Sequence, residues 1–165
     1  MPTKQTIKAA QRDKRQGKSA STQAGEFVKA EMDRIRKGQT GARSSKQAIA
    51  IGLSEARRAG VELKAPAKGK TSEKTRKNAE RALAKGQRNE PIDPVRSRAR
   101  TKAMKKEGTE AASPRALSRQ ATTAAKQRSS ADRSNSAKQA ARTKGPAERS
   151  AAAKKAARTR AQHSR

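Results

Sequence analysis

The chain has 165 residues, of which 43 are Lys or Arg and 14 are Asp or Glu, so its formal net charge at pH 7 is +29. Hydrophobic residues make up 30% of it, and 34 of them are alanine, a composition typical of chains that are mostly disordered when alone. It excludes one large hydrophobic core, a disulfide framework and a stretch of about 18 apolar residues that could span a membrane.

Apolar and basic residues are unevenly distributed. Residues 1–64 hold 11 of the 16 Val, Ile, Leu, Met and Phe residues and a net charge of +9, whereas residues 65–165 hold a net charge of +20. No large apolar residue follows Leu117. We therefore predict an all-α chain in three parts: a basic N-terminal arm at 1–20, a helical hairpin module at 21–64, and a basic Ala/Lys/Arg-rich tail from 65 to the end, formed of short helices or disorder.

The first helix of the hairpin is predicted to begin after Ser21 or Thr22 as the N-cap and to run to Lys37, with Gly38 beyond it. Large apolar residues at helical spacing form its buried face: Phe27, Val28, Met32 and Ile35. The turn at residues 39–43 then leads into a second helix.

That second helix is predicted to begin at Ser44, which has Gln47 at the capping-box spacing, and to end at Gly60. Its buried face is formed by residues at helical spacing: Ile49, Gly52, Leu53 and Ala56. Ile51 lies on another face. Because a hairpin of this size buries too little apolar area to be stable alone, we expect it to self-associate or to bind a protein partner, with Ile51 in the contact.

Short helices of about 12–16 residues are predicted along the tail. A basic residue shortly before glycine is typical of a helix C-terminus and recurs six times, before Gly17, Gly38, Gly60, Gly86, Gly108 and Gly145. A capping-type residue before proline is typical of a helix start and occurs at Asp93-Pro94, Ser113-Pro114 and Gly145-Pro146. Closely spaced like charges oppose these helices, so we expect phosphate to stabilise them.

No motif in the sequence indicates catalysis, a metal or a cofactor, and we expect a protein that is not an enzyme. Two GK[ST] tripeptides at 17–19 and 69–71 lack the first glycine of a phosphate-binding loop. The segment from Gly38 to Gly41 has the G-x-x-G spacing of KH domains, but we interpret it as a flexible turn whose backbone amides could meet a phosphate. His163 is the only histidine, too few for a metal cluster.

The excess of positive charge predicts a polyanionic partner. The near absence of aromatic residues argues against a reader of single-stranded bases and favours the backbone of duplex DNA, without sequence preference. In the module and in the tail, the predicted contacts are Arg43, Lys46, Arg57, Arg58, Arg115, Arg119, Lys126, Arg128, Arg142, Lys144, Lys154, Lys155, Arg158 and Arg160. The alternatives are an RNA- or ribosome-associated basic protein, a disordered stress protectant, and an adaptor whose hairpin binds one protein.

Two parts of the sequence resemble known proteins. STQAGEFV (21–28) and KQAIAIGLSEARRAG (46–60) are similar to a family of small basic bacterial proteins of unknown function, which implies a bacterial origin and a helical module but no activity. The tail, for example RSAAAKKAARTR (149–160), resembles the Ala/Lys/Arg-rich tails of bacterial histone-like and linker-histone-like proteins. Ser113-Pro114-Arg115 resembles the S-P-basic element of linker-histone tails. The likeness of the tail implies association with the nucleoid, and the composition itself predicts a cytoplasmic protein that faces a polyanion.

Overall fold

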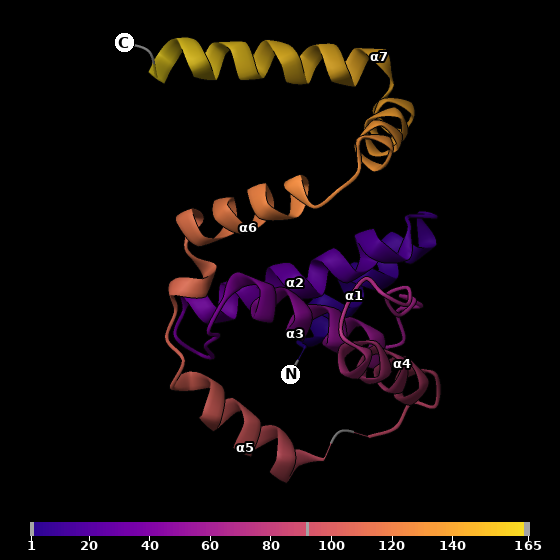
Figure 1. The fold of residues 1–165 in the computed structure, drawn as a ribbon, viewed down its shortest axis with the longest axis vertical. Helices are drawn as coiled ribbons and strands as arrows, with labels where there is room; N and C mark the ends of the chain where they lie inside the picture. The colour runs from indigo at the N-terminus through magenta and orange to yellow at the C-terminus, as the bar shows by residue number, and fades with distance from the viewer. Residues whose placement is uncertain (1, 92, 164–165) are drawn as a thin grey trace. The chain divides into compact units, whose positions relative to one another are not determined.

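The computed structural model describes residues 2–91 and 93–163, apart from the side chains of residues 143, 144 and 163. The fold is all-α, as predicted, with no strand among the described residues. In chain order the helices are α1 (Lys4–Arg15), α2 (Ala20–Arg36), α3 (Ser45–Arg58), α4 (Glu73–Gln87), α5 (Pro94–Lys105), the short 3-10 helix η1 (Glu110–Ala112), α6 (Pro114–Lys126) and α7 (Ser130–His163) (Figure 1).

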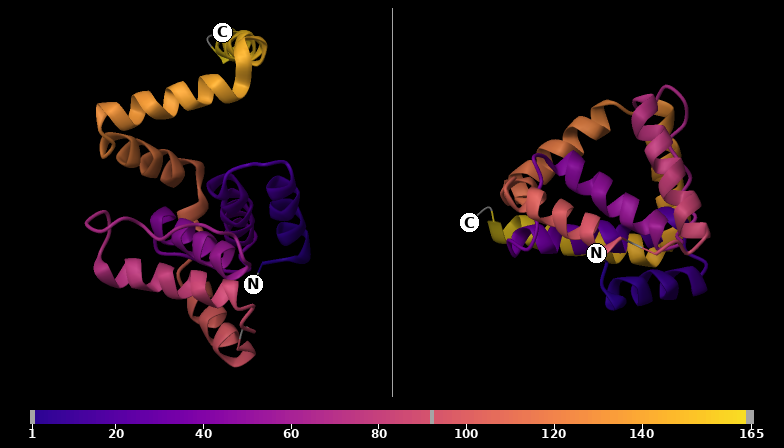
Figure 2. Two further views of the ribbon diagram at one scale, coloured as in Figure 1. Left: turned by 90° about the vertical axis from the view of Figure 1, so that its right-hand side faces the viewer. Right: turned by 90° about the horizontal axis from the view of Figure 1, so that it is seen from below.

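The chain divides into two compact units, Met1–Gln120 and Ala121–Arg165, with the boundary inside α6. In the first unit α2 and α3 form the central pair, α1 packs against α2, and α4 packs against α3 (Figure 2). The first unit therefore includes, besides the α2–α3 hairpin, the helix that precedes it and the helix that follows it. The boundaries at residues 20 and 64, which rest on composition, remain predictions.

The two hairpin helices begin at serine caps. The N-cap of α2 is Ser19, whose Oγ accepts from the backbone N–H of Thr22 at 3.4 Å, so the prediction of Ser21 or Thr22 was wrong. Ser19 has non-helical backbone dihedrals (φ −59°, ψ 153°), and residues 20 onward are already helical. Ser44 caps α3 as predicted, accepting from the N–H of Gln47 at 3.2 Å. Gln47 Oε1 accepts in return from the N–H of Arg43 at 2.9 Å.

Glycine after a basic last turn ends α1, α2 and α3 as predicted. Beyond α2, Gly38 (φ +67°) donates to the Ile35 carbonyl at 2.9 Å, and Gln39 donates to the Arg34 carbonyl at 2.9 Å, which is the Schellman pattern.

The prediction for Gly86 was wrong, because this residue lies inside α4. The corresponding left-handed position after α4 is taken by Asn89 (φ +50°), the other residue type that tolerates it. The predicted starts at Asp93 and Ser113 are confirmed: their side chains accept from the backbone N–H groups of Val95 and Ala116 at 2.9 and 3.2 Å.

The first unit has two small cores, both rich in alanine. One lies between α2, α3 and η1 and contains Met32, Ile35, Ala42, Ala48, Ala111 and Ala112. The other, between α1, α2, α3 and the chain after α3, contains Ala10, Ala24, Phe27, Ala56 and Val61. Alanine buries little area per residue, so these cores depend on the close approach of helix backbones.

Ile51 is not an exposed contact residue, so that prediction was wrong. Its exposed fraction is 8%, because the chain's own packing covers it. α4 packs against α3 and buries Ala79 and Ala82. Part of the burial that the hairpin lacks is therefore supplied by helices outside it.

The turn at residues 39–43 is held in place, contrary to the prediction of a flexible turn. Thr40, Gly41 and Ala42 are buried, and the N–H of Ala42 donates to the Gly108 carbonyl at 3.3 Å. A Cβ at Gly41 would lie 2.5 Å from the Met104 carbonyl oxygen. Glycine at this position therefore allows the backbone at Met104 and Gly108 to pack against the turn. The Ala42 amide is therefore satisfied within the chain and does not face a phosphate.

Replacing Gly86 by alanine is expected to destabilise the first unit by about 1–3 kcal/mol, a typical overpacking cost. A Cβ there would lie 1.9 Å from the backbone oxygen of Arg57, which outweighs the gain in helix propensity. Gly25→Ala is the matched control, because Gly25 lies inside α2 and a Cβ at this position would have nothing within 4 Å. It should stabilise by about 0.5–1 kcal/mol. Urea unfolding followed by circular dichroism measures both, and equal shifts would contradict the α3–α4 packing.

The second unit has no core of its own. None of the described side chains between residues 121 and 163 is buried. α7 is broken at Gly145 (φ 63°, ψ 168°), and Pro146 follows the break, as the predicted helix start at Gly145-Pro146 requires. The unit thus consists of helical segments whose described side chains are exposed or half-exposed.

Candidate nucleic-acid interface

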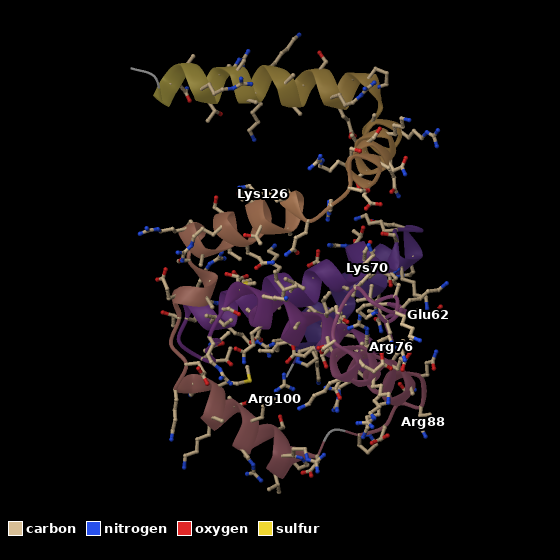
Figure 3. The ribbon with its side chains drawn as sticks, in the orientation of Figure 1. Glu62, Lys70, Arg76, Arg88, Arg100 and Lys126 are labelled. Carbon is tan, nitrogen blue, oxygen red and sulfur yellow. The ribbon has the colours of Figure 1, made fainter. Side chains whose placement is uncertain are left out.

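The second unit has a higher net positive charge per residue than the first unit. From residue 121 to 165 there are twelve Lys or Arg residues and two acidic residues. All of the predicted tail contacts whose side chains are described are exposed: Arg115, Arg119, Lys126, Arg128, Arg142, Lys154, Lys155, Arg158 and Arg160. Of these, Lys126 is labelled in Figure 3. The side chains of Lys144 and His163 lie outside the described part of the structure.

Of the four predicted contacts in the module, Arg43, Lys46 and Arg58 are exposed. Arg43 forms an ion pair with Glu107, with 3.3 Å between Nε and Oε1. Because both side chains are partly or largely solvated, this pair is worth little and does not prevent Arg43 from meeting a phosphate.

Arg57 is not a phosphate contact, so that prediction was wrong. Its exposed fraction is 6%, and its guanidinium donates to the backbone carbonyls of Leu63 and Lys64 at 3.0 and 3.2 Å. Burial lowers the pKa of Arg57 below its ordinary value, as expected when a cation loses water. Arg57 therefore holds the segment that follows α3 against α3 through these two hydrogen bonds.

Arg57→Gln is expected to destabilise the first unit by about 1.5–3 kcal/mol, the range for hydrogen bonds made by a charged group. Arg58→Gln removes the same charge from the neighbouring exposed position and should change stability by less than about 0.5 kcal/mol. Thermal unfolding of the two variants measures the difference. Equal effects would contradict the buried position of Arg57.

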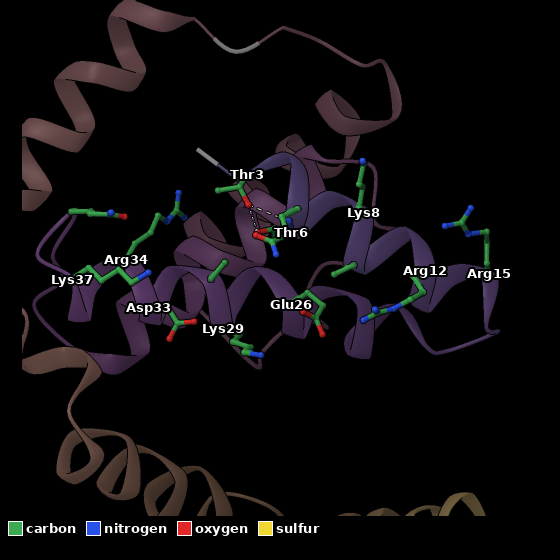
Figure 4. A pocket seen from close by; sticks show the side chains of 14 residues that line it. Thr3, Thr6, Lys8, Arg12, Arg15, Glu26, Lys29, Asp33, Arg34 and Lys37 are labelled. Carbon is green, nitrogen blue, oxygen red and sulfur yellow. Dashed lines mark hydrogen bonds between the residues drawn. The ribbon is translucent and has the colours of Figure 1, made fainter.

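Sequence reasoning missed a basic groove between α1 and α2, of about 770 Å³. Its basic residues are Lys8, Arg12 and Arg15 from α1, Lys29 and Arg34 from α2, and Lys37, the C-cap residue of α2. Its acidic residues are Glu26 and Asp33 (Figure 4). Ala9 and Ala30 also line the groove, and their small side chains leave room between the longer ones.

α1 is positioned by apolar packing and by its connection to α2. Ala10, with Ile7 beside it, packs in the core that contains Phe27. In the connection, Lys18 Nζ lies 2.8 Å from the buried Asp13 carboxylate, and Gln23 Nε2 donates to the Lys18 carbonyl at 2.8 Å. Lys8, Arg12 and Arg15 are at i, i+4 and i+7, which places them on one face of α1. This spacing is the sequence feature that could have revealed the groove.

Ion pairs engage some cations of the first unit, including Arg34 of the groove. Arg34 donates to both Glu31 and Glu55, and Arg36 binds Asp33 at 3.1 Å. In α4, the hydrogen bond from Arg76 lowers the pKa of Glu73 below its ordinary value. The same effect from Lys85 lowers the pKa of Glu90.

Five groove cations have no such partner. Within the described residues, no ion pair involves Lys8, Arg12, Arg15, Lys29 or Lys37. The groove therefore carries uncompensated positive charge and is chemically suited to phosphate.

Comparison with known proteins places this groove in a shared segment. Residues 3–69 match a family of unknown function, DUF6496. The match covers α1, α2 and α3 and ends before α4, so the groove lies inside it and the basic second unit lies outside. No significant match was found among curated proteins or among solved structures.

The described part of the chain holds neither a candidate metal centre nor a candidate membrane span. No group of three or more His, Cys, Asp or Glu residues is placed there to hold a metal ion. No helix in the described ranges is both long and apolar enough to cross a membrane.

Proposed function

We propose that this protein binds duplex DNA without sequence preference, by neutralising backbone phosphates, as a nucleoid-associated protein of the bacterial cytoplasm. The observation that carries the proposal is the second unit, with twelve basic and two acidic residues and no buried side chain among those described. A helical segment that buries nothing of its own gains stability from a partner that neutralises its charge.

The chemistry of these side chains favours backbone contact over base reading. Lys and Arg bind phosphates through charge, and this contact releases condensed counterions in a way that does not depend on sequence. α7 carries alanine, serine and basic residues, and the chain has only one aromatic residue, Phe27, which is buried. No exposed aromatic side chain is therefore present among the described residues for stacking on bases.

The proposal predicts a steep dependence of affinity on salt. If about half of the twelve cations of the second unit contact phosphates, the slope of log K against log salt is about −5, which is a loss of about 10³-fold between 50 and 200 mM salt. Fluorescence anisotropy with a labelled duplex of mixed sequence measures this slope. Lys154→Gln combined with Lys155→Gln should reduce its magnitude by about 2.

An affinity that does not change with salt concentration, or no binding at 50 mM salt, would contradict the proposal. Competition between duplex DNA and ribosomal RNA tests the nearest alternative, because an RNA-associated protein prefers the RNA at equal phosphate concentration. A protein that protects an enzyme during drying and binds neither nucleic acid would instead be a stress protectant.

A further inference from the structure

We propose that the chain has two separate duplex-binding surfaces, the α1–α2 groove and the basic helices of the second unit, and that it holds two duplex segments together. The inference rests on the proposed function for the second unit and adds a site in the first. The two surfaces lie in different compact units and share no residue.

The groove has the charge and length to contact a phosphate backbone. Lys8 and Arg15 are seven residues apart on one face of α1, about 10 Å along the helix axis. One strand of a duplex carries about three phosphates over that length, and α1 offers three cations there, Lys8, Arg12 and Arg15. Lys29 of α2 and Lys37, the C-cap residue of that helix, line the same groove. Glu26 is the one carboxylate of the groove without an ion pair among the described residues, so positive charge prevails.

The groove is held in shape by tertiary packing, which the described residues of the second unit lack. Its walls are packed through Ala10 and Phe27, and its connection is fastened by the Asp13–Lys18 pair. Binding there costs little ordering of the backbone, so the groove can hold a duplex while the second unit holds another. Linking two weak surfaces in one chain raises the effective concentration of the second contact.

The test is capture of one duplex by another. A biotinylated 60-base-pair duplex on beads is incubated with the full-length protein and a fluorescent duplex of different sequence at 50 mM salt, and the retained fluorescence is measured. Anisotropy with a single duplex runs in parallel. Three triple variants are compared with the unaltered chain: K8Q/R12Q/R15Q in the groove, K74Q/K77Q/R81Q on α4, and K154Q/K155Q/R158Q on α7.

The α4 variant is the matched control. It removes the same charge from exposed residues of a packed helix that does not line the groove. Glutamine keeps helix propensity close to that of Lys and Arg, and circular dichroism checks that each variant is folded. We expect the unaltered chain and the α4 variant to capture the second duplex equally. The groove variant should capture about tenfold less while still binding a single duplex, and the α7 variant should also capture less.

Several results would overturn the inference. Equal capture by the groove and α4 variants would remove the groove as a site, and a dimer in sedimentation analysis would then assign bridging to self-association. Capture of single-stranded RNA in preference to the second duplex would assign the groove to RNA. Single-duplex binding without any capture refutes bridging alone, whereas absence of single-duplex binding refutes the proposed function itself.

Discussion

Replacing Phe27 by alanine is expected to lower the free energy of unfolding of the first unit by about 3–5 kcal/mol. Phe27 is 1% exposed and is the largest fully buried side chain. It packs in a core with Ala10, Ala24, Ala56 and Val61, and the alanine side chains are too small to fill the cavity that its removal leaves. Because small domains are stable by only about 5–15 kcal/mol, this one change removes much of the total. Urea unfolding followed by circular dichroism measures it.

Two controls separate the cavity from a general loss of apolar surface. Phe27→Leu keeps most of the volume and should cost clearly less than alanine. Val95→Ala removes an apolar side chain that is 67% exposed and should change stability by less than about 0.5 kcal/mol. A Phe27→Ala cost as small as that of Val95→Ala would show that the core between α1, α2 and α3 is not formed.

Replacing Arg34 by methionine is expected to destabilise the first unit by about 3–5 kcal/mol at pH 7, because it removes the ion-pair partner of the buried Glu31 carboxylate. Arg34 Nη2 donates to Glu31 and, at 2.5 Å, to Glu55, so it joins α2 to α3. Glu31 is 1% exposed, and its Oε1 has no hydrogen-bond partner. Glu31 therefore depends on Arg34 for its charge to be tolerated.

The cost of Arg34→Met should shrink as the pH falls. Burial raises the pKa of Glu31 above its ordinary value of 4.5, while Arg34 opposes this rise. A carboxyl whose pKa is higher in the folded state binds more protons there, so its contribution favours folding at low pH and is lost as pH rises through the raised pKa. Without Arg34 the pKa of Glu31 rises further. The variant therefore loses more stability than the unaltered chain as the pH rises towards 7.

Unfolding measurements at pH 4, 5, 6 and 7 for both proteins test this dependence. The difference in unfolding free energy between the unaltered chain and Arg34→Met should increase with pH. Arg36→Met is the control, because the Arg36–Asp33 pair is about half exposed and a solvated pair contributes little. A difference that stays constant with pH would contradict a buried, ionised Glu31.

Local features of the sequence predicted the helices well. The cap at Ser44, the glycine ends of α2 and α3, and the starts at Asp93 and Ser113 depend on a few neighbouring residues, and the structure has them where the sequence indicates. The error at Gly86 shows the limit of such rules. A basic residue before glycine gives the same local pattern whether the glycine ends its helix or lies inside it where another helix packs closely. At Gly86 the second case holds, because the backbone of α3 lies against it.

The features that sequence reasoning missed depend on contacts between distant segments. Arg57 is buried and donates to carbonyls of the segment after α3, and Ile51 is buried by tertiary packing. No local pattern in the sequence shows either. In the second unit no described side chain is buried, so alanine there can contribute only its helix propensity. Ala111 and Ala112 are different, because they are buried in a core. The α1–α2 groove likewise needs the packing of α1, for which composition alone predicts only a basic arm.

The alanine-rich cores have a thermodynamic consequence. The heat capacity change of unfolding is determined mainly by the apolar area that becomes exposed, and it averages about 12–15 cal/mol/K per residue in globular proteins. Nine of the fourteen buried hydrophobic residues in the described chain are alanine, so the value here should fall below that average. A small heat capacity change makes the curve of stability against temperature flat. The first unit is then expected to lose stability gradually on both heating and cooling, and to keep its groove over a wide range of temperature.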